Sequence, residues 1–145
     1  MKKFLLSILL SLVATLALAQ DAAPRDQLYK ALGEKAGLVK LMDDFLPRLQ
    51  ADPRTGPFFK KVDEANLKQQ LVDQFCEVSG GPCTYKGQDM KTSHMDLKIN
   101  RAHFNALVEI LQVSMDAQGI PFAAQNKLLA ELAGMHRAII TTEKR

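Results

Sequence analysis

Apolar residues that recur every three or four positions place the strongest constraint on how this chain folds. This spacing puts them on one face of an α-helix, which must then be buried against another element. Similar stripes occupy three later stretches, and no stretch shows the alternation typical of a β-strand. The sequence therefore predicts an all-α fold. The first stripe comprises Leu38, Leu41, Met42, Phe45, Leu46 and Leu49.

Capping residues and helix breakers divide this pattern into separate helices. Asp63 suits the N-cap of a helix that ends before Gly80, and Asn100 suits the N-cap of a helix that ends before Gly119. The inner faces of these two helices are Leu67, Leu71, Phe75 and Val78, then Phe104, Leu107, Val108, Leu111 and Met115.

Two prolines add further boundaries. Pro47 lies inside the first stripe and removes one backbone donor, so we expect a kink there or an early end of that helix. Pro121 suits the first position of a last helix, because that position needs no backbone N–H. That last helix is expected to continue to Ile140, with Leu128, Leu129, Leu132, Met135 and Ile139 on its apolar side.

The first 19 residues have the pattern of a cleaved export signal. Lys2 and Lys3 precede an apolar run, and a small-x-small cleavage site follows at residues 17–19. The run is shorter than the roughly 20 residues that cross a bilayer comfortably, so no stable membrane span is expected. An uncleaved anchor is the alternative. We expect export, to the periplasm, and a single domain over residues 20–145.

The net charge argues against a nucleic-acid partner. The whole chain carries a formal charge of +3, and removal of residues 1–19 takes away two lysines and no acid, which leaves +1. No basic run remains to form an electrostatic footprint for nucleic acid. The apparent basicity therefore belongs mostly to the export signal.

Two cysteines, Cys76 and Cys83, offer two interpretations. In an exported protein an even number of cysteines favours a disulfide, which would contribute about 2–3 kcal/mol for so small a loop. The alternative is a pair of free, buried thiols. A zinc site is not expected, because no second pair of cysteines lies nearby.

A loop rich in turn residues, 80–88, interrupts the helices and precedes His94. Met90 lies four residues before His94 and Leu97 three after it, so one helical face would carry all three. A zinc or non-haem iron site would need further Asp, Glu or Cys ligands, whereas haem needs one strong protein ligand and apolar walls. His103 and His136 are expected at the surface or the core edge.

The order of several short motifs resembles a truncated haemoglobin of the first group. The resemblance runs from about residue 26 to 140 and implies a truncated-globin fold, a two-over-two helical sandwich around haem b. The motifs are Leu28-Tyr29, Leu32-Gly33, Asp43-Asp44-Phe45, Ala51-Asp52-Pro53-Arg54, Phe58-Phe59, Gly80-Gly81-Pro82, Tyr85, Gly87, Met90-Lys91, His94 and Gly119-Ile120-Pro121.

The resemblance also implies roles for residues on the proximal side. His94 matches the family's proximal iron ligand, Phe59 the aromatic residue that stacks on the haem, and Met90 a haem-contacting position. Lys91 is placed to meet a propionate, with an exposed lysine as the alternative. Tyr85 would border the haem or reach a propionate, or it would only anchor the loop.

On the distal side the sequence departs from the family pattern. Leu46 stands where many members have a tyrosine that hydrogen-bonds bound oxygen. Leu67 and Leu71 fall on the haem-facing side of their helix, and Gln70 beside them is the best candidate for a distal donor. The alternative is a solvated Gln70 at the rim of the pocket. Weak retention of oxygen follows as a hypothesis.

The resemblance implies a haem protein that binds oxygen, nitric oxide and carbon monoxide. It allows oxygen carriage, sensing or nitric oxide dioxygenation, and the last would need a separate electron-donor protein as the reductant. A haem-free helical binding module with the globin fold is the main alternative. A peroxidase-like enzyme is less favoured, because the sequence offers no evident polar distal acid–base pair.

Overall fold

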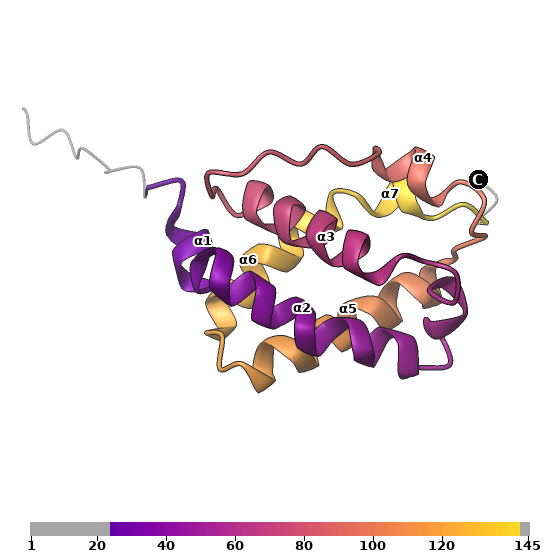
Figure 1. Cartoon of the computed structure of the whole chain (residues 1–145), viewed down its shortest axis with the longest axis horizontal. Coiled ribbons are helices and arrows are strands. Elements are labelled where there is room, and N and C mark those ends of the chain that lie inside the picture. The colour runs from indigo at the N-terminus through magenta and orange to yellow at the C-terminus, as the bar shows by residue number, and fades with distance from the viewer. Residues whose placement is uncertain (1–23, 143–145) are drawn as a thin grey trace, which may run out of the picture.

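A computed structural model of the protein describes residues 24–142 (Figure 1), so the predicted export signal lies outside the described residues. Every regular element within this range is a helix, which confirms the all-α prediction. In chain order the elements are α1 (Gln27–Ala31), α2 (Glu34–Ala51), the 3-10 helix η1 (Gly56–Phe58), α3 (Glu64–Val78), α4 (Met90–His94), α5 (Arg101–Ala117), α6 (Phe122–Ala133) and α7 (His136–Ile139).

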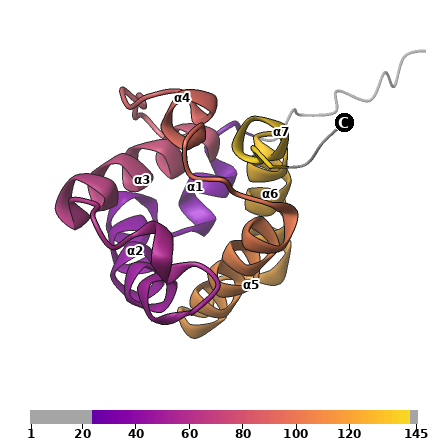
Figure 2. The same cartoon turned by 90° about the vertical axis from the view of Figure 1, so that its right-hand side faces the viewer.

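The long helices enclose one core (Figure 2). Helix α2 packs against both α3 and α5, and α5 packs against α6, while the short helices α4 and α7 lie next to each other at one edge. All six apolar residues of the first stripe are buried, as their spacing predicts. The largest fully buried side chains are Phe45, Leu38, Leu41, Met42, Leu46, Leu49, Leu111, Met115 and Leu128.

Helix α2 continues through Pro47 to Ala51, so of the two outcomes expected at Pro47 the early end is wrong. A proline inside a helix costs about 3 kcal/mol. Burial of a large apolar side chain contributes about 1.5–3 kcal/mol. Phe45, Leu46 and Leu49 flank the proline and are at most 2% exposed, so their burial outweighs the lost hydrogen bond.

The two predicted N-caps are confirmed. The carboxylate of Asp63 accepts a hydrogen bond from the backbone N–H of Asn66 at 3.1 Å. The side chain of Asn100 accepts one from the backbone N–H of His103 at 2.9 Å, and Nδ1 of His103 accepts one from the backbone N–H of Asn100 at 3.3 Å. Both caps satisfy helix-end donors that would otherwise lack a partner.

The single last helix expected up to Ile140 is wrong, because the structure divides it into α6 and α7. Pro121 is the N-cap of α6 rather than its first helical residue. The break falls at Gly134 and Met135, where glycine gives the helix little support. After the break, α7 packs against α4.

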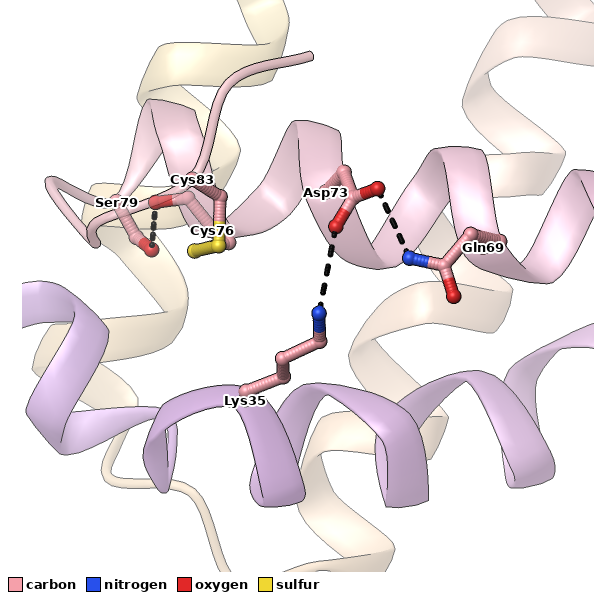
Figure 3. The surroundings of a disulfide bond; sticks show 6 residues. All are labelled: Lys35, Gln69, Asp73, Cys76, Ser79 and Cys83. Atoms are coloured by element: carbon pink, nitrogen blue, oxygen red, sulfur yellow. Dashed lines mark hydrogen bonds and ion pairs between the residues drawn. A yellow bond between two sulfur atoms is a disulfide. The ribbon is translucent and has the colours of Figure 1, made fainter. Parts of the chain in front are cut away.

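Cys76 and Cys83 form a disulfide, which confirms that interpretation over free thiols. Cys76 is fully buried on the last turns of α3, and Cys83 lies on the loop that follows (Figure 3). Gly80 makes the turn between them in a left-handed conformation, with φ of 85°. A Cβ atom there would lie 1.9 Å from the carbonyl oxygen of Arg25, so a larger residue is excluded.

Candidate functional site

His94 ends the short helix α4, which begins at an N-cap formed by Asp89. The Asp89 carboxylate accepts hydrogen bonds from the backbone N–H and the hydroxyl of Thr92, at 2.9 and 2.7 Å. The hydrogen bond from the Thr92 side chain is the main reason that the pKa of Asp89 lies below its usual range. The cap allows a helix of only five residues to form after the loop.

The hydrogen bonds of His94 determine which ring nitrogen is available for a metal. Nδ1 lies 2.7 Å from the carbonyl oxygen of Met90 and 2.9 Å from the hydroxyl of Ser93. A carbonyl oxygen can only accept, so we assign the proton to Nδ1, which donates to Met90. Nε2 therefore keeps its lone pair and is the nitrogen that could bind iron.

Helix α3 provides an apolar wall and reaches α4 through the contact of Gln74 with Met90. Leu67 and Leu71 are half-buried and pack against the main core cluster. On the same face, Gln74 is 7% exposed, and its amide Nε2 lies 3.3 Å from the sulfur of Met90 and 3.6 Å from the sulfur of Met135. The α3 wall is thus apolar apart from this buried amide.

Gln74 is a site residue that the sequence reasoning missed. It follows Leu67 by seven positions and Leu71 by three, so its place on the inner face could have been read from the spacing. Its contact with Met135 could not, because that contact depends on the break before α7.

The structure places Gln70 toward the loop rather than deep between the helices. Gln70 is half-buried, and a Cβ atom on Gly87 would lie 2.6 Å from its carbonyl oxygen and 2.3 Å from the Tyr85 hydroxyl oxygen. Gln70, Tyr85 and Gly87 therefore meet at the inner side of the loop. The role of Gln70 as a distal donor stays a prediction.

Three other predicted residues take clear positions. The Tyr85 hydroxyl donates to the backbone oxygen of Gln88 at 2.8 Å, which makes Tyr85 an anchor of its own loop. Burial, and secondarily the charge of Asp89, raises the pKa of Tyr85. Lys91 is exposed on α4, where it could meet a carboxylate of a ligand. Leu46 is fully buried in the core on α2.

The corner around η1 holds the predicted aromatic pair. Phe59 is half-buried, packs against the core and lines an open hollow of about 580 Å³ with Gln50 and Glu64. Phe58 turns the other way, and its ring lies 4.9 Å from that of His103 beside a hollow of about 440 Å³. His136 contacts the ring of Phe104 at 4.8 Å. Both hollows lie at the η1 corner, and His94 lines neither.

The backbone after His94 is held by the end of the described chain. The carbonyl oxygen of Ile99 accepts hydrogen bonds from the backbone N–H of Thr141 at 2.9 Å and of Thr142 at 3.2 Å, and from the Thr142 hydroxyl at 3.1 Å. This contact joins the segment after α4 to the segment after α7. Nothing in the local sequence pattern predicts it.

The donor set fits haem better than a bare metal ion. Across residues 24–142 no three His, Cys, Asp or Glu side chains come together as a metal site. A haem needs one imidazole nitrogen, which His94 offers, and apolar walls, which Leu67, Leu71 and Met90 offer.

No helix within residues 24–142 is long and apolar enough to cross a membrane.

An all-helical core with a candidate proximal histidine on a short helix at its edge is typical of a globin. The sequence model of the family described as bacterial-like globin matches residues 27–141, and the chain belongs to that family. A relative from Synechocystis sp., the group 1 truncated haemoglobin GlbN, is 30% identical over 74% of this chain and 87% of that protein. The chain is therefore a group 1 truncated haemoglobin.

Solved structures support the same assignment. The truncated haemoglobin of Tetrahymena pyriformis in its Fe(III) form matches with a TM-score of 0.76 at 25% identity, over 79% of this chain and 97% of that one. The 2/2 haemoglobin of Synechococcus sp., solved with covalently attached haem, matches with a TM-score of 0.71 at 25% identity, over 77% and 94% of the two chains. The predicted two-over-two truncated-globin fold is confirmed.

Proposed function

We propose that this protein binds haem b through Nε2 of His94 and uses the haem iron to bind oxygen, nitric oxide and carbon monoxide. The observation that carries the proposal is the hydrogen bond from His94 Nδ1 to the Met90 carbonyl, which leaves Nε2 as the free ligand nitrogen. A relative named as a group 1 truncated haemoglobin and a solved 2/2 haemoglobin with haem attached support the cofactor. The haem-free binding module is not favoured.

The residues around the site would each hold a different part of the cofactor. Met90, Leu67 and Leu71 would contact the faces of the macrocycle, and Phe59 would stack on it from the η1 corner. Lys91 would pair with a propionate through its exposed ammonium group. Haem, when bound, would supply the iron that binds diatomic ligands, and the chain would supply the apolar contacts and the ligand nitrogen.

An absorption spectrum of the protein reconstituted with haemin tests this proposal. We expect a Soret band with one haem per chain, and loss of the five-coordinate ferrous spectrum in His94→Ala. His103→Ala is the matched control, because it removes another half-buried histidine outside the proposed site and should keep the wild-type spectrum. Failure of the wild-type chain to take up haem would overturn the proposal.

Oxygen retention is expected to be weak because Leu46, Leu67 and Leu71 offer no hydrogen bond. Stopped-flow mixing should show rapid oxygen dissociation, and Gln70→Leu should change the rate little if Gln70 stays at the loop. Slow dissociation in the wild type that becomes fast in Gln70→Leu would identify Gln70 as the donor instead.

Nitric oxide dioxygenation would require an electron-donor protein, and steady turnover with an added reductase would reveal that activity.

We also propose that residues 1–19 export the protein to the periplasm and are then removed. The basic and apolar pattern of those residues supports this, as does the Cys76–Cys83 disulfide, because disulfides persist in oxidising compartments. The mass of the protein from a periplasmic fraction should match a chain that begins at Gln20. A full-length mass in the cytoplasmic fraction would contradict the proposal.

A further inference from the structure

Gln74 is a polar side chain in a place where an apolar one would fit. It is 7% exposed, and its amide Nε2 contacts two thioether sulfurs, those of Met90 at 3.3 Å and Met135 at 3.6 Å. Thioether sulfur is a weak acceptor, so these contacts compensate poorly for removal of the amide from water. A leucine would fill the same space without that cost. The glutamine is therefore expected to serve something other than stability.

The contacts of Met90 show what Gln74 could serve. Its sulfur accepts from Gln74 on α3, and its backbone oxygen accepts from Nδ1 of His94 at 2.7 Å. Met90 thus joins the buried amide of Gln74 to Nδ1 of His94, the ring nitrogen that does not bind iron in the proposed site. A change in the position of Met90 would change the length of the hydrogen bond made by His94.

Helix α4 needs such an external contact because its own packing does not fix it. It has five residues, none of them buried, and its N-cap comes from the residue just before it, Asp89. Its neighbour α7 has four residues, and none of these is buried either. The amide of Gln74 touches Met90 at the start of α4 and Met135 at the start of α7, so it connects both short helices to the well-packed α3.

We propose that Gln74 is a positioning residue for His94: its amide holds Met90 against Met135 and thereby fixes the carbonyl oxygen to which His94 Nδ1–H donates. The proposal rests on the proposed function, since it assumes that His94 binds iron. A firm hydrogen bond at Nδ1 fixes the ring orientation and makes Nε2 a more basic ligand. Gln74 would therefore tune the strength of the iron–histidine bond without touching the iron.

Resonance Raman spectroscopy of the ferrous, haem-loaded full chain tests this through the iron–histidine stretching band. In Gln74→Leu we expect the band to move to lower frequency and broaden, and the reduction potential to rise, because a less basic ligand stabilises ferric iron less. Gln69→Leu is the matched control. It is the same substitution on the same helix, but the Gln69 amide bonds to Asp73 on the exposed side at 2.9 Å (Figure 3), so the band should not move.

A double-mutant cycle separates this role from a general loosening of the site. If Gln74 acts through Met90, Gln74→Leu should shift the band in the wild type and add no further shift in the Met90→Leu background. An equal shift in both backgrounds, or an unmoved band in Gln74→Leu, would overturn the proposal. If Gln74→Leu fails to fold, Gln74→Met keeps the length of the side chain without its N–H donors and should give the same shift.

Nitrogen NMR of the histidine rings in the full chain without added haem gives an independent readout. We expect a single set of His94 signals with the proton on Nδ1 in the wild type, and a second set with the other tautomer in Gln74→Leu. If both proteins show the expected His94 signals but the wild type takes up no haem, the proposed function fails while the role of Gln74 in orienting His94 stands. If haem binds but both spectra of Gln74→Leu match the wild type, only the positioning role fails.

Discussion

Helices α3 and α4 both contribute residues to the proposed haem site, but different interactions hold them. Helix α3 is anchored by buried apolar residues and packs along α2. Helix α4 has no buried residue, and it depends on its Asp89 cap, the Gln74 amide, and the contact of Ile99 with Thr141 and Thr142. The comparison suggests a rigid wall facing an adjustable one, with the iron ligand on the adjustable side.

Deletion of a core side chain on α3 should have the largest effect on stability. Phe75 is 3% exposed, and we expect Phe75→Ala to lower the free energy of unfolding by about 3–5 kcal/mol, because it loses burial and leaves a cavity. Leu97, just after α4, is 38% exposed, so Leu97→Ala should cost less than about 0.5 kcal/mol. Urea denaturation of both variants measures the difference. Equal losses would contradict the contrast between the two walls.

The disulfide should rank second, because it ties the loop before α4 to the rigid end of α3. Replacement of both Cys76 and Cys83 by alanine should lower the free energy of unfolding by about 2–3 kcal/mol in the chain-entropy model. The wild-type protein treated with a reductant should lose a similar amount, and the double variant should not respond to the reductant. A reductant-sensitive double variant would show that the reductant acts elsewhere.

The two aspartate caps allow the same chemical change to be made on each wall. Asp63→Ala should lower the global free energy of unfolding by about 1 kcal/mol, since α3 unfolds with the core. Asp89→Ala should leave global unfolding nearly unchanged and instead speed hydrogen exchange within α4, because this helix can open locally. Exchange rates and urea midpoints measured on both variants test this, and a global loss in Asp89→Ala would show that α4 belongs to the cooperative core.

The smallest expected effect is the pH dependence of α4. The pKa of Asp89 is lowered in the folded chain, so its contribution is present above the ordinary aspartate pKa of about 3.9 and is lost as the pH falls through the lowered value. The backbone signal of Thr92 should therefore stay constant down to about pH 4 and move below it. In Asp89→Asn the cap remains but does not titrate, so a signal that moves equally there would rule out Asp89 as the cause.

Much of the fold follows from local patterns in the sequence. The stripe in α2, the caps at Asp63 and Asn100, and the short helix that carries His94 depend on residues within a few positions of one another, and all were predicted. The expectation that Leu97 shares a helical face with His94 is wrong, because α4 ends at His94 and Leu97 is exposed beyond it. The resemblance to group 1 truncated haemoglobins identified the family. The pairing of Cys76 with Cys83 was favoured by their number and the expected compartment, and the structure confirms it.

The sequence alone thus determined the helical class, the family and the candidate iron ligand. The tertiary structure decided three further points: that α2 passes through Pro47, that α6 and α7 separate at Gly134, and that Gln74 lies between Met90 and Met135. Periodicity and capping are local, whereas each of these outcomes depends on which groups pack opposite a residue. The free energy gained by burial of Phe45 and Leu49 exceeds the cost of the proline in α2. The separate helix α7 packs against α4, a neighbour that is distant in the sequence.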